Sequence, residues 1–189
     1  MLNVNIFSNN LLFVKIIKKN FKIKNVYSDK DVDKNFRIFC NKKSIKFKRI
    51  LKKKDLKKII DKSVDLCLIF GFGLIFDKNF IKKFKYGIWN FHTGDLPKFR
   101  GRHPLTWAFL NDEKKIAMSV HSINQNIDQG YLIHKYFVER TYKDDLNTIL
   151  DKILIKLDKE IIKIKKKIFL KKKKKLFKGK YFPPLFKGI

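Results

Sequence analysis

The chain has 189 residues, 44% of them hydrophobic, and a formal net charge of +29 from 46 basic residues against 17 acidic ones. This length predicts a single domain with a sizeable core, and the hydrophobic content is ordinary for a globular protein. No apolar run reaches the length of a membrane span, so we expect no transmembrane helix. The apolar run at residues 11–17 is short and interrupted by Lys15, so we expect no signal peptide there.

The first third of the chain predicts alternating strands and helices. The expected elements are a strand at 2–7, a helix to about 20, a strand at 21–27, a short strand at 37–40 and a surface helix at 51–62. Ser8-Asn9-Asn10 offers side-chain oxygens that can cap the first of these helices. In the surface helix we expect Leu56, Ile59 and Ile60 to face inward.

The middle of the chain predicts a buried strand that ends in a glycine-rich turn. Residues 64–70 form a continuous apolar run, typical of a central parallel strand buried on both faces. Gly71-Phe72-Gly73 then lets the backbone approach a ligand. Asp77 is expected to cap a short helix to residue 84. The next strand, at 87–91, delivers polar side chains at its carboxyl end, where open α/β sheets place their sites.

The last third predicts a hairpin-like pair of strands and a long helix. The expected elements are a helix at 104–110, strands at 116–123 and 131–138, and an amphipathic helix at 143–175 that covers the sheet. Residues 171–175 are all lysine, which fits a solvated face or, alternatively, a phosphate-binding tail. We therefore expect a catalytic domain at residues 1–170 and a lysine-rich tail at 171–189.

Two segments carry side chains that could take part in catalysis. Residues 90–104 read Asn-Phe-His-Thr-Gly-Asp-Leu-Pro-Lys-Phe-Arg-Gly-Arg-His-Pro, and Asp128-Gln129-Gly130 begins 36 residues after His92. Transfer of an acyl group to an amine passes through an oxyanion, which the amide of Asn90 can stabilise. It also needs a proton acceptor near neutrality, which His92 can be, oriented by Asp128. Each residue has a structural alternative, in which Asp128 merely opens a turn and Gly130 supplies a positive φ.

Residues 65–142 resemble the catalytic domain of the formyltransferases that use N10-formyltetrahydrofolate. The motifs that carry the resemblance are Asn90-Phe91-His92, Leu96-Pro97-Lys98-Phe99-Arg100-Gly101 and Asp128-Gln129-Gly130. The resemblance implies an α/β fold with a single doubly wound, mostly parallel sheet of the Rossmann-like formyltransferase type. It also implies that Asn90, His92 and Asp128 are the catalytic residues of an enzyme of one-carbon metabolism.

The same resemblance suggests a binding site for the folate co-substrate. Its predicted residues are Phe72, Gly73, Leu74, Ile75, Leu96, Pro97 and Asp128. Arg100 and Gly101 are predicted to contact the substrates, although Arg100 could equally stabilise its own loop. We expect no metal, because no pair of His or Cys has ligand spacing. His121 and His134 lie far from the motifs in sequence and receive no role.

The acceptor of the formyl group is less well specified. A nucleotide-linked amino sugar is favoured, because residues 92–107 look closest to the sugar-nucleotide and methionyl-tRNA branches and residues 179–184 resemble an element of the former. Methionyl-tRNA comes next, because methionyl-tRNA formyltransferases usually have a second, C-terminal domain and this chain is too short to include one. Glycinamide ribonucleotide follows, because the loop of its formyltransferases does not usually read Arg-Gly-Arg-His-Pro-Leu, as residues 100–105 do here. The Ser8-Asn9-Asn10 turn also lacks the glycines that family members commonly carry near the acceptor phosphate. Hydrolysis of the folate, and a polyanion-binding remnant without activity, remain alternatives.

The basic charge has two open explanations. It could attract phosphate-rich partners such as tRNA, or it could record A/T-rich codons, which specify Lys, Ile, Phe and Asn. Only five of the basic residues are arginine, the side chain that phosphate recognition favours. Some nonspecific affinity for polyanions is expected in either case. Cys40 and Cys67 match no metal or redox spacing, which favours a reducing cytoplasmic setting. The short apolar runs predict no membrane partner.

Overall fold

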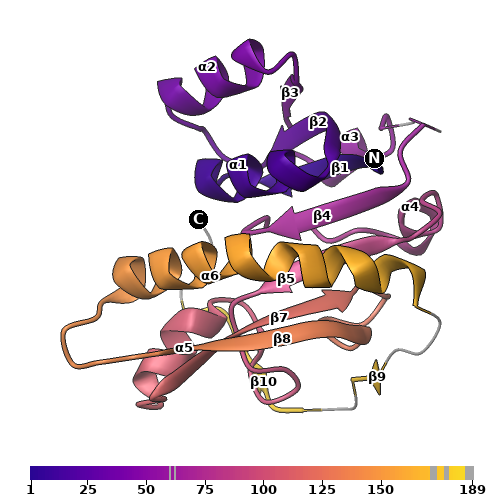
Figure 1. Ribbon diagram of the computed structural model, residues 1–189. Helices are drawn as coiled ribbons and strands as arrows, with labels where there is room; N and C mark the ends of the chain where they lie inside the picture. Colours follow the sequence, from indigo (N-terminus) through magenta and orange to yellow (C-terminus); the bar gives the residue numbers. More distant parts are fainter. Residues whose placement is uncertain (60, 62, 171–173, 177–178, 186–189) are drawn as a thin grey trace. The chain divides into compact units, whose positions relative to one another are not determined.

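The computed structural model describes residues 1–59, 61, 63–170, 174–176 and 179–185 (Figure 1). The chain divides into two compact units, Met1–Asn90 and Phe91–Ile189. Strand β5 (Ile88–His92) crosses the boundary between them. The expected fold class, α/β with a mostly parallel sheet, is confirmed. The expected lysine-rich tail lies partly outside the described residues.

The first unit is a parallel sheet with helices between its strands. Its strands run in the order β3-β2-β1-β4-β5, and every pair is parallel. The elements are β1 (Asn3–Ser8), α1 (Leu11–Asn20), β2 (Lys22–Ser28), α2 (Lys34–Lys42), β3 (Lys46–Arg49), α3 (Lys53–Leu56), β4 (Leu66–Phe70) and α4 (Lys78–Ile81). All five residues of β4 are buried, which confirms the central strand that its apolar run predicts.

Side-chain caps fix where three of these helices begin. Asn10 accepts a hydrogen bond from Phe13 N at 2.8 Å, and Asp77 caps α4 through Phe80 N in the same way. Both caps were expected from the sequence, while the cap of α2 by Asp33 was not. Each cap satisfies one of the backbone N–H groups that a helix start leaves unpaired.

Replacing Asn10 by alanine should lower the free energy of unfolding by about 1 kcal/mol, because α1 loses the acceptor of its Phe13 N–H. Urea denaturation followed by circular dichroism measures the loss. Asn10→Asp retains a capping oxygen and serves as the matched control. Equal destabilisation by both substitutions would contradict the capping role.

Two expectations for the first unit are wrong. The short strand expected at residues 37–40 is part of α2, because Phe36 and Cys40 are buried at the i, i+4 spacing of one helix face. The helix expected at 51–62 is reduced to α3. Leu56 and Ile59 are buried as expected, and Ile60 lies outside the described residues.

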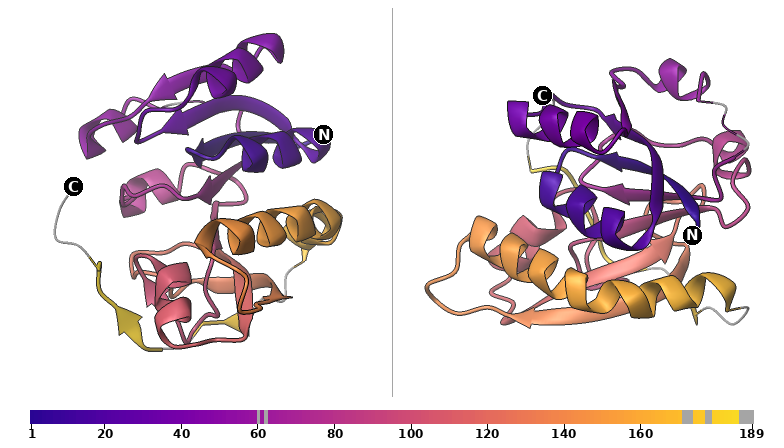
Figure 2. Two further views of the ribbon diagram at one scale, coloured as in Figure 1. Left: turned by 90° about the vertical axis from the view of Figure 1, so that its left-hand side faces the viewer. Right: turned by 45° about the horizontal axis from the view of Figure 1, so that its top comes forward.

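The second unit combines an antiparallel sheet with one long helix (Figure 2). β7 (Lys115–Ser122) pairs antiparallel with β8 (Tyr131–Glu139), and β8 with β9 (Lys174–Lys175). The remaining elements are β6 (Arg100–Gly101), α5 (Pro104–Leu110), α6 (Leu146–Lys166), the 3-10 helix η1 (Lys167–Phe169) and β10 (Tyr181–Phe182). α6 lies along β7 and β8 and buries an apolar stripe there, as its helical spacing predicts: Ile149, Ile153, Leu154, Leu157, Ile161 and Ile164.

The long helix ends earlier than expected. It stops at Lys166, and Lys174 and Lys175 pair as a strand with Leu132 and Tyr131. Backbone hydrogen bonding to the open edge of β8 therefore replaces the helical continuation in this short stretch. The predicted solvated run includes residues 171–173, which lie outside the described part. Among the described residues, no helix is both long and apolar enough to cross a membrane.

Candidate active site

The strand β5 carries the first two predicted catalytic residues. Asn90 and His92 are two positions apart, and residues at this spacing point to the same face of a strand. Asn90 is half-buried and belongs to the first unit, whereas His92 belongs to the second unit and is buried. The strand therefore presents an amide and an imidazole in succession.

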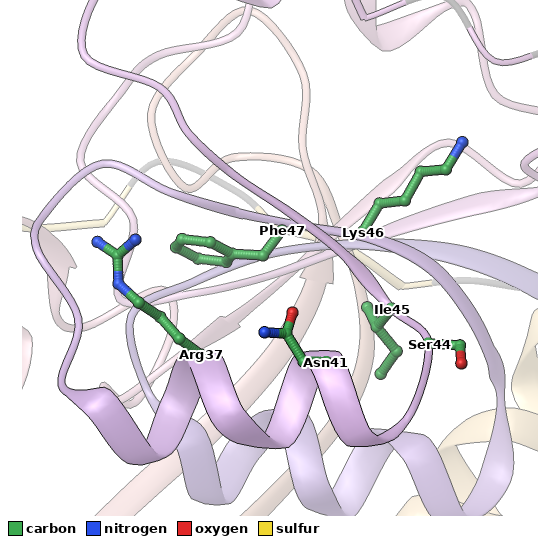
Figure 3. Close-up of a pocket in the computed structure, with 6 residues that line it drawn as sticks. All are labelled: Arg37, Asn41, Ser44, Ile45, Lys46 and Phe47. Atoms are coloured by element: carbon green, nitrogen blue, oxygen red, sulfur yellow. The ribbon is translucent and has the colours of Figure 1, made fainter.

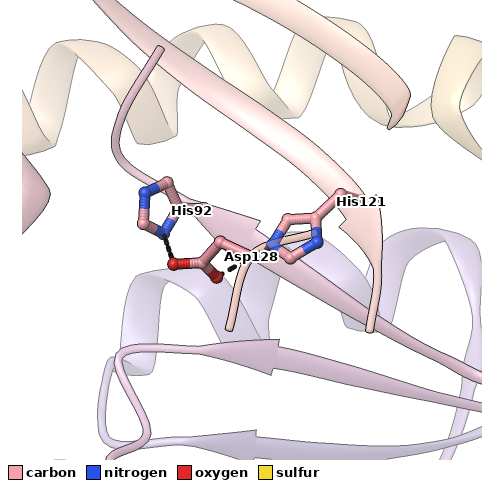
Figure 4. Close-up of side chains that lie close together, drawn as sticks. All are labelled: His92, His121 and Asp128. Carbon is pink, nitrogen blue, oxygen red and sulfur yellow. Dashed lines mark ion pairs between the residues drawn. The ribbon is translucent and has the colours of Figure 1, made fainter. Parts of the chain in front are cut away.

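The imidazole of His92 is held between two oxygen atoms of the second unit. Its Nε2 lies 2.6 Å from the carbonyl oxygen of Phe99, and its Nδ1 lies 3.8 Å from Oδ2 of Asp128 (Figure 4). A carbonyl oxygen can only accept a hydrogen bond, so Nε2 carries a hydrogen and donates it. In the neutral ring, the basic nitrogen is therefore Nδ1, on the side that faces the carboxylate.

Asp128 is fixed by its backbone conformation and by one N–H group. Its φ is +54°, in the left-handed region, and its Oδ2 accepts a hydrogen bond from Gly101 N at 2.9 Å. The alternative in which Gly130 supplies the positive φ of this turn is wrong, because Asp128 itself adopts it. Gly130 is needed for space instead, since a Cβ there would collide with the carbonyl oxygen of Ser122.

A second imidazole, which the sequence did not single out, completes the cluster. His121 is fully buried near the end of β7, and its Nε2 lies 3.4 Å from Oδ1 of Asp128. Its Nδ1 lies 3.0 Å from the carbonyl oxygen of Ser122, to which it donates. His121 received no role because it is not close to the motifs in sequence, but the fold brings it against Asp128. Its place near a strand end, seven residues before Asp128, was the available signal.

Burial and charge act in opposite directions on these groups. Burial lowers the pKa of His92 below its usual value, and the neighbouring Asp128 carboxylate only partly restores it. Burial also acts to raise the pKa of Asp128. The positive charge that His92 carries when protonated, the contacts of His121 and the Gly101 N–H outweigh it, and that pKa ends well below its usual range. At neutral pH the cluster therefore holds an ionised carboxylate beside a predominantly neutral imidazole at His92.

Arg100, a predicted substrate contact, is buried and donates hydrogen bonds to backbone carbonyl groups. Its guanidinium donates to the Ile127 carbonyl from Nε and Nη2, at 3.1 and 2.8 Å, and to the Gly179 carbonyl from Nη1, at 3.1 Å. The side chain thus joins the loop before Asp128 to the segment that leads into β10. Gly101, next to it, donates its N–H to Asp128. The contacts favour the alternative in which Arg100 stabilises its own loop.

Arg100→Lys should lower the free energy of unfolding by about 1–3 kcal/mol, because an ammonium group cannot reach both carbonyls as the guanidinium fork does. Urea denaturation gives the value. Arg37→Lys, at an exposed position where a lysine can also lie over the Phe47 ring, is the matched control and should change stability by no more than about 0.5 kcal/mol. If the two variants unfold alike, the bridging role of Arg100 is refuted.

The predicted folate-binding residues fall in both units. In the second unit, Leu96 is buried and donates its N–H to Ser119 Oγ at 3.1 Å, while Pro97 is exposed and follows a cis peptide bond. In the first unit, residues 72–75 follow β4. There Gly73 donates its N–H to Asp29 at 2.5 Å, and the Ile75 side chain is 60% exposed. Their role in folate binding stays a prediction.

The remaining polar residues near the motifs have local partners. Asp95 pairs with Lys135 at 2.5 Å, and His103 Nδ1 accepts a hydrogen bond from Leu185 N at 3.4 Å. His134 contacts Glu160 through its Nε2, which lies 2.9 Å from Oε2 of that carboxylate. Among the described residues, three groups could hold a metal ion together: His92, His121 and Asp128, whose ligand atoms lie within 4.8 Å of one another.

An open hollow of about 470 Å³ lies in the first unit, away from these motifs in sequence (Figure 3). It is lined by Arg37, Asn41, Ser44, Ile45, Lys46 and Phe47. The Arg37 guanidinium lies 5.4 Å from the centre of the Phe47 ring. None of its lining residues is an acid, a histidine or a cysteine, so the hollow offers no acid–base pair for proton transfer.

Comparison with known proteins supplies a family for this arrangement. The family model described as Formyl transferase matches residues 13–163. A methionyl-tRNA formyltransferase of Prochlorococcus marinus (strain AS9601) is 28% identical over 121 residues, which are 62% of this chain and 37% of that protein. The matched part thus spans little more than a third of that relative's length.

Solved structures share the fold at low identity. Glycinamide ribonucleotide transformylase 1 from Symbiobacterium toebii aligns with a TM-score of 0.75 at 16% identity, over 87% of this chain and 85% of that one. The N-formyltransferase from Helicobacter canadensis, solved in complex with folinic acid and dTDP-3-aminofucose, aligns with a TM-score of 0.69 at 20% identity. That alignment covers 97% of this chain and 71% of the other.

Proposed function

This chain belongs to the formyl transferase family, and we propose that it transfers a formyl group from N10-formyltetrahydrofolate to a primary amine. The observation that carries the proposal is the buried pairing of His92 with the ionised Asp128, in a chain that has the family's motifs. The motif asparagine, Asn90, precedes His92 on the same face of β5. The proposed co-substrate is therefore a folate, and the reaction is group transfer.

The proposed chemistry needs only proton movement and charge stabilisation. Attack of the amine on the formyl carbon produces a tetrahedral intermediate with a negative oxygen, which the side-chain amide of Asn90 would stabilise by donating a hydrogen bond. His92 would take the proton of the attacking amine and return one to the folate nitrogen as it leaves. Asp128 would stabilise the imidazolium formed in between.

The geometry refines which form of His92 begins the reaction. Because burial lowers its pKa, the resting imidazole is predominantly neutral and ready to accept a proton, rather than an imidazolium ready to donate one. Its Nε2 hydrogen is engaged by Phe99, which leaves Nδ1 as the basic atom. We therefore assign His92 the role of general base in the first step and general acid in the second.

The folate would bind through the residues that the family resemblance predicts. In the first unit these are Phe72, Gly73, Leu74 and Ile75, where the turn after β4 exposes backbone and an apolar side chain. In the second unit they are Leu96, Pro97 and Asp128. The proposed reaction requires no metal ion.

The favoured acceptor is a nucleotide-linked amino sugar. The element at residues 179–184 that motivates this choice includes β10, and β10 pairs with β6. Binding of an acceptor through a terminal phosphate, as in glycinamide ribonucleotide, is disfavoured at the start of α1, where phosphates commonly bind. There Asn9 donates to Asp29 at 2.7 Å and to the Gly71 carbonyl at 3.0 Å, and the Asp29 carboxylate would repel a phosphate. Methionyl-tRNA is the second candidate and glycinamide ribonucleotide the third.

An acceptor panel tests the proposal. The protein is incubated with N10-formyltetrahydrofolate and, in turn, a nucleotide-linked amino sugar, methionyl-tRNA and glycinamide ribonucleotide. Release of tetrahydrofolate is followed by absorbance, and formylation of the acceptor by mass spectrometry. We expect turnover that depends on the amino sugar. Release without any acceptor would identify a hydrolase instead, and no release under any condition, with steep salt-dependent RNA binding, would refute the enzyme.

A further inference from the structure

The two imidazoles around Asp128 are oriented in a way that proton transfer alone does not require. His92 donates from Nε2 to the Phe99 carbonyl, and His121 donates from Nδ1 to the Ser122 carbonyl. The other nitrogen of each ring, which has a lone pair whenever that ring is neutral, faces the Asp128 carboxylate. Three electron-pair donors thus converge on one buried point (Figure 4).

We propose that His92, His121 and Asp128 form a binding site for a divalent transition metal ion, with the ligand chemistry of zinc. Two imidazole nitrogens and one carboxylate oxygen are a three-residue zinc ligand set, which leaves one position for water or another ligand. Metal-bound histidines almost always donate their second N–H to a carbonyl or carboxylate. The Phe99 and Ser122 carbonyls already serve both rings in that way.

The distances fit an ion better than direct hydrogen bonds. The two imidazole nitrogens lie 3.8 and 3.4 Å from the carboxylate oxygens, beyond the usual N–H···O range of about 2.7–3.2 Å. Two ligands at about 2.0–2.1 Å from a tetrahedral zinc ion are about 3.3–3.4 Å apart. All three ligand atoms lie within 4.8 Å of one another, so small side-chain rotations complete the set.

Burial strengthens the site and defines its consequence. The side chains of His92, His121 and Asp128 are 5%, 1% and 9% exposed, so little water competes for them. An ion bound to Nδ1 of His92 occupies the atom that must accept a proton in the proposed reaction. Zinc therefore inhibits formyl transfer by competing with that proton, and this consequence rests on the proposed function. The proposed metal binding does not depend on that function.

Binding is measured first, without folate or acceptor. The protein, stripped with a chelator, is titrated with Co²⁺ and followed by visible absorption, because tetrahedral Co²⁺ absorbs far more strongly than the octahedral aqua ion. Zinc affinity comes from calorimetry. We expect one ion per chain and intense Co²⁺ bands that zinc displaces. His121→Ala should weaken zinc binding by at least about 100-fold, the upper range for loss of a mere supporting partner.

The matched control is His134→Ala, which removes the imidazole that contacts Glu160 and leaves the proposed ligands intact. It should retain the Co²⁺ bands. Asp128→Asn provides a second ligand variant should His121→Ala fail to fold, as judged by circular dichroism. Weak octahedral Co²⁺ spectra in the unmodified protein, or equal affinity in the ligand variants, would overturn the site. An inactive protein that still shows these bands would instead refute only the formyl transfer.

Discussion

His92→Gln should lower kcat for formyl transfer by about 10²- to 10⁴-fold, the usual contribution of a positioned acid–base group. Glutamine retains an N–H that can donate to the Phe99 carbonyl, as Nε2 of His92 does, but it cannot accept a proton from an amine. The substitution thus removes the chemistry while preserving one contact of the side chain. Steady-state assays of tetrahydrofolate release, made in the presence of a chelator, give the effect on kcat and on KM for the folate.

The control for this variant is His134→Gln, which removes a half-buried imidazole outside the cluster. It should retain most of the activity. Unfolding curves for both proteins separate loss of catalysis from loss of fold. Wild-type kcat in a folded His92→Gln protein would remove His92 from the mechanism and, with it, the proposed assignment of Asp128.

Asp128→Asn should reduce kcat by a similar factor of about 10²–10³, because the imidazolium formed during transfer loses its neighbouring charge. The asparagine oxygen can still accept from Gly101 N, so the loop keeps that contact. The carboxylate raises the pKa of His92, and its removal lowers this pKa further. The acidic limb of the kcat/KM profile, where His92 becomes protonated, should therefore move to lower pH.

This shift is measured by pH–rate profiles of both proteins with chelator present. Glu113→Gln is the matched control, since its carboxylate pairs with Lys98 at the surface and is absent from the cluster. Its profile should overlay that of the unmodified protein. A profile of Asp128→Asn that moved to higher pH would show that the carboxylate does not act on His92 by charge.

Local sequence patterns predicted most of the elements because local forces decide them. The apolar run of β4, the helical spacing of α6 and the caps at Asn10 and Asp77 are read within a few residues. The pattern failed at residues 37–40, where an aromatic, cysteine-containing stretch resembles a strand. There the unrecognised cap at Asp33 and burial of Phe36 and Cys40 on one face produce a helix.

Contacts between distant segments could not be predicted in this way. His121 meets Asp128, and Arg100 reaches the Gly179 carbonyl 79 residues away, only because strands and loops are brought together by the fold. The spacing rule that argued against a metal considers neighbours in sequence. Such a rule cannot detect a group of possible ligands that come from β5, β7 and a loop, as His92, His121 and Asp128 do.

By itself, the sequence determined the chemistry available to this protein: an amide, an imidazole and a carboxylate in family motifs, on an α/β framework set by hydrophobic periodicity. How those groups act depends on the contacts that the folded chain makes. Ring orientation, the tautomer of each histidine and the lowered pKa of His92 follow from burial and from carbonyls that distant segments supply. Hydrogen bonding and desolvation depend on neighbours in space, which the order of residues in the chain does not specify.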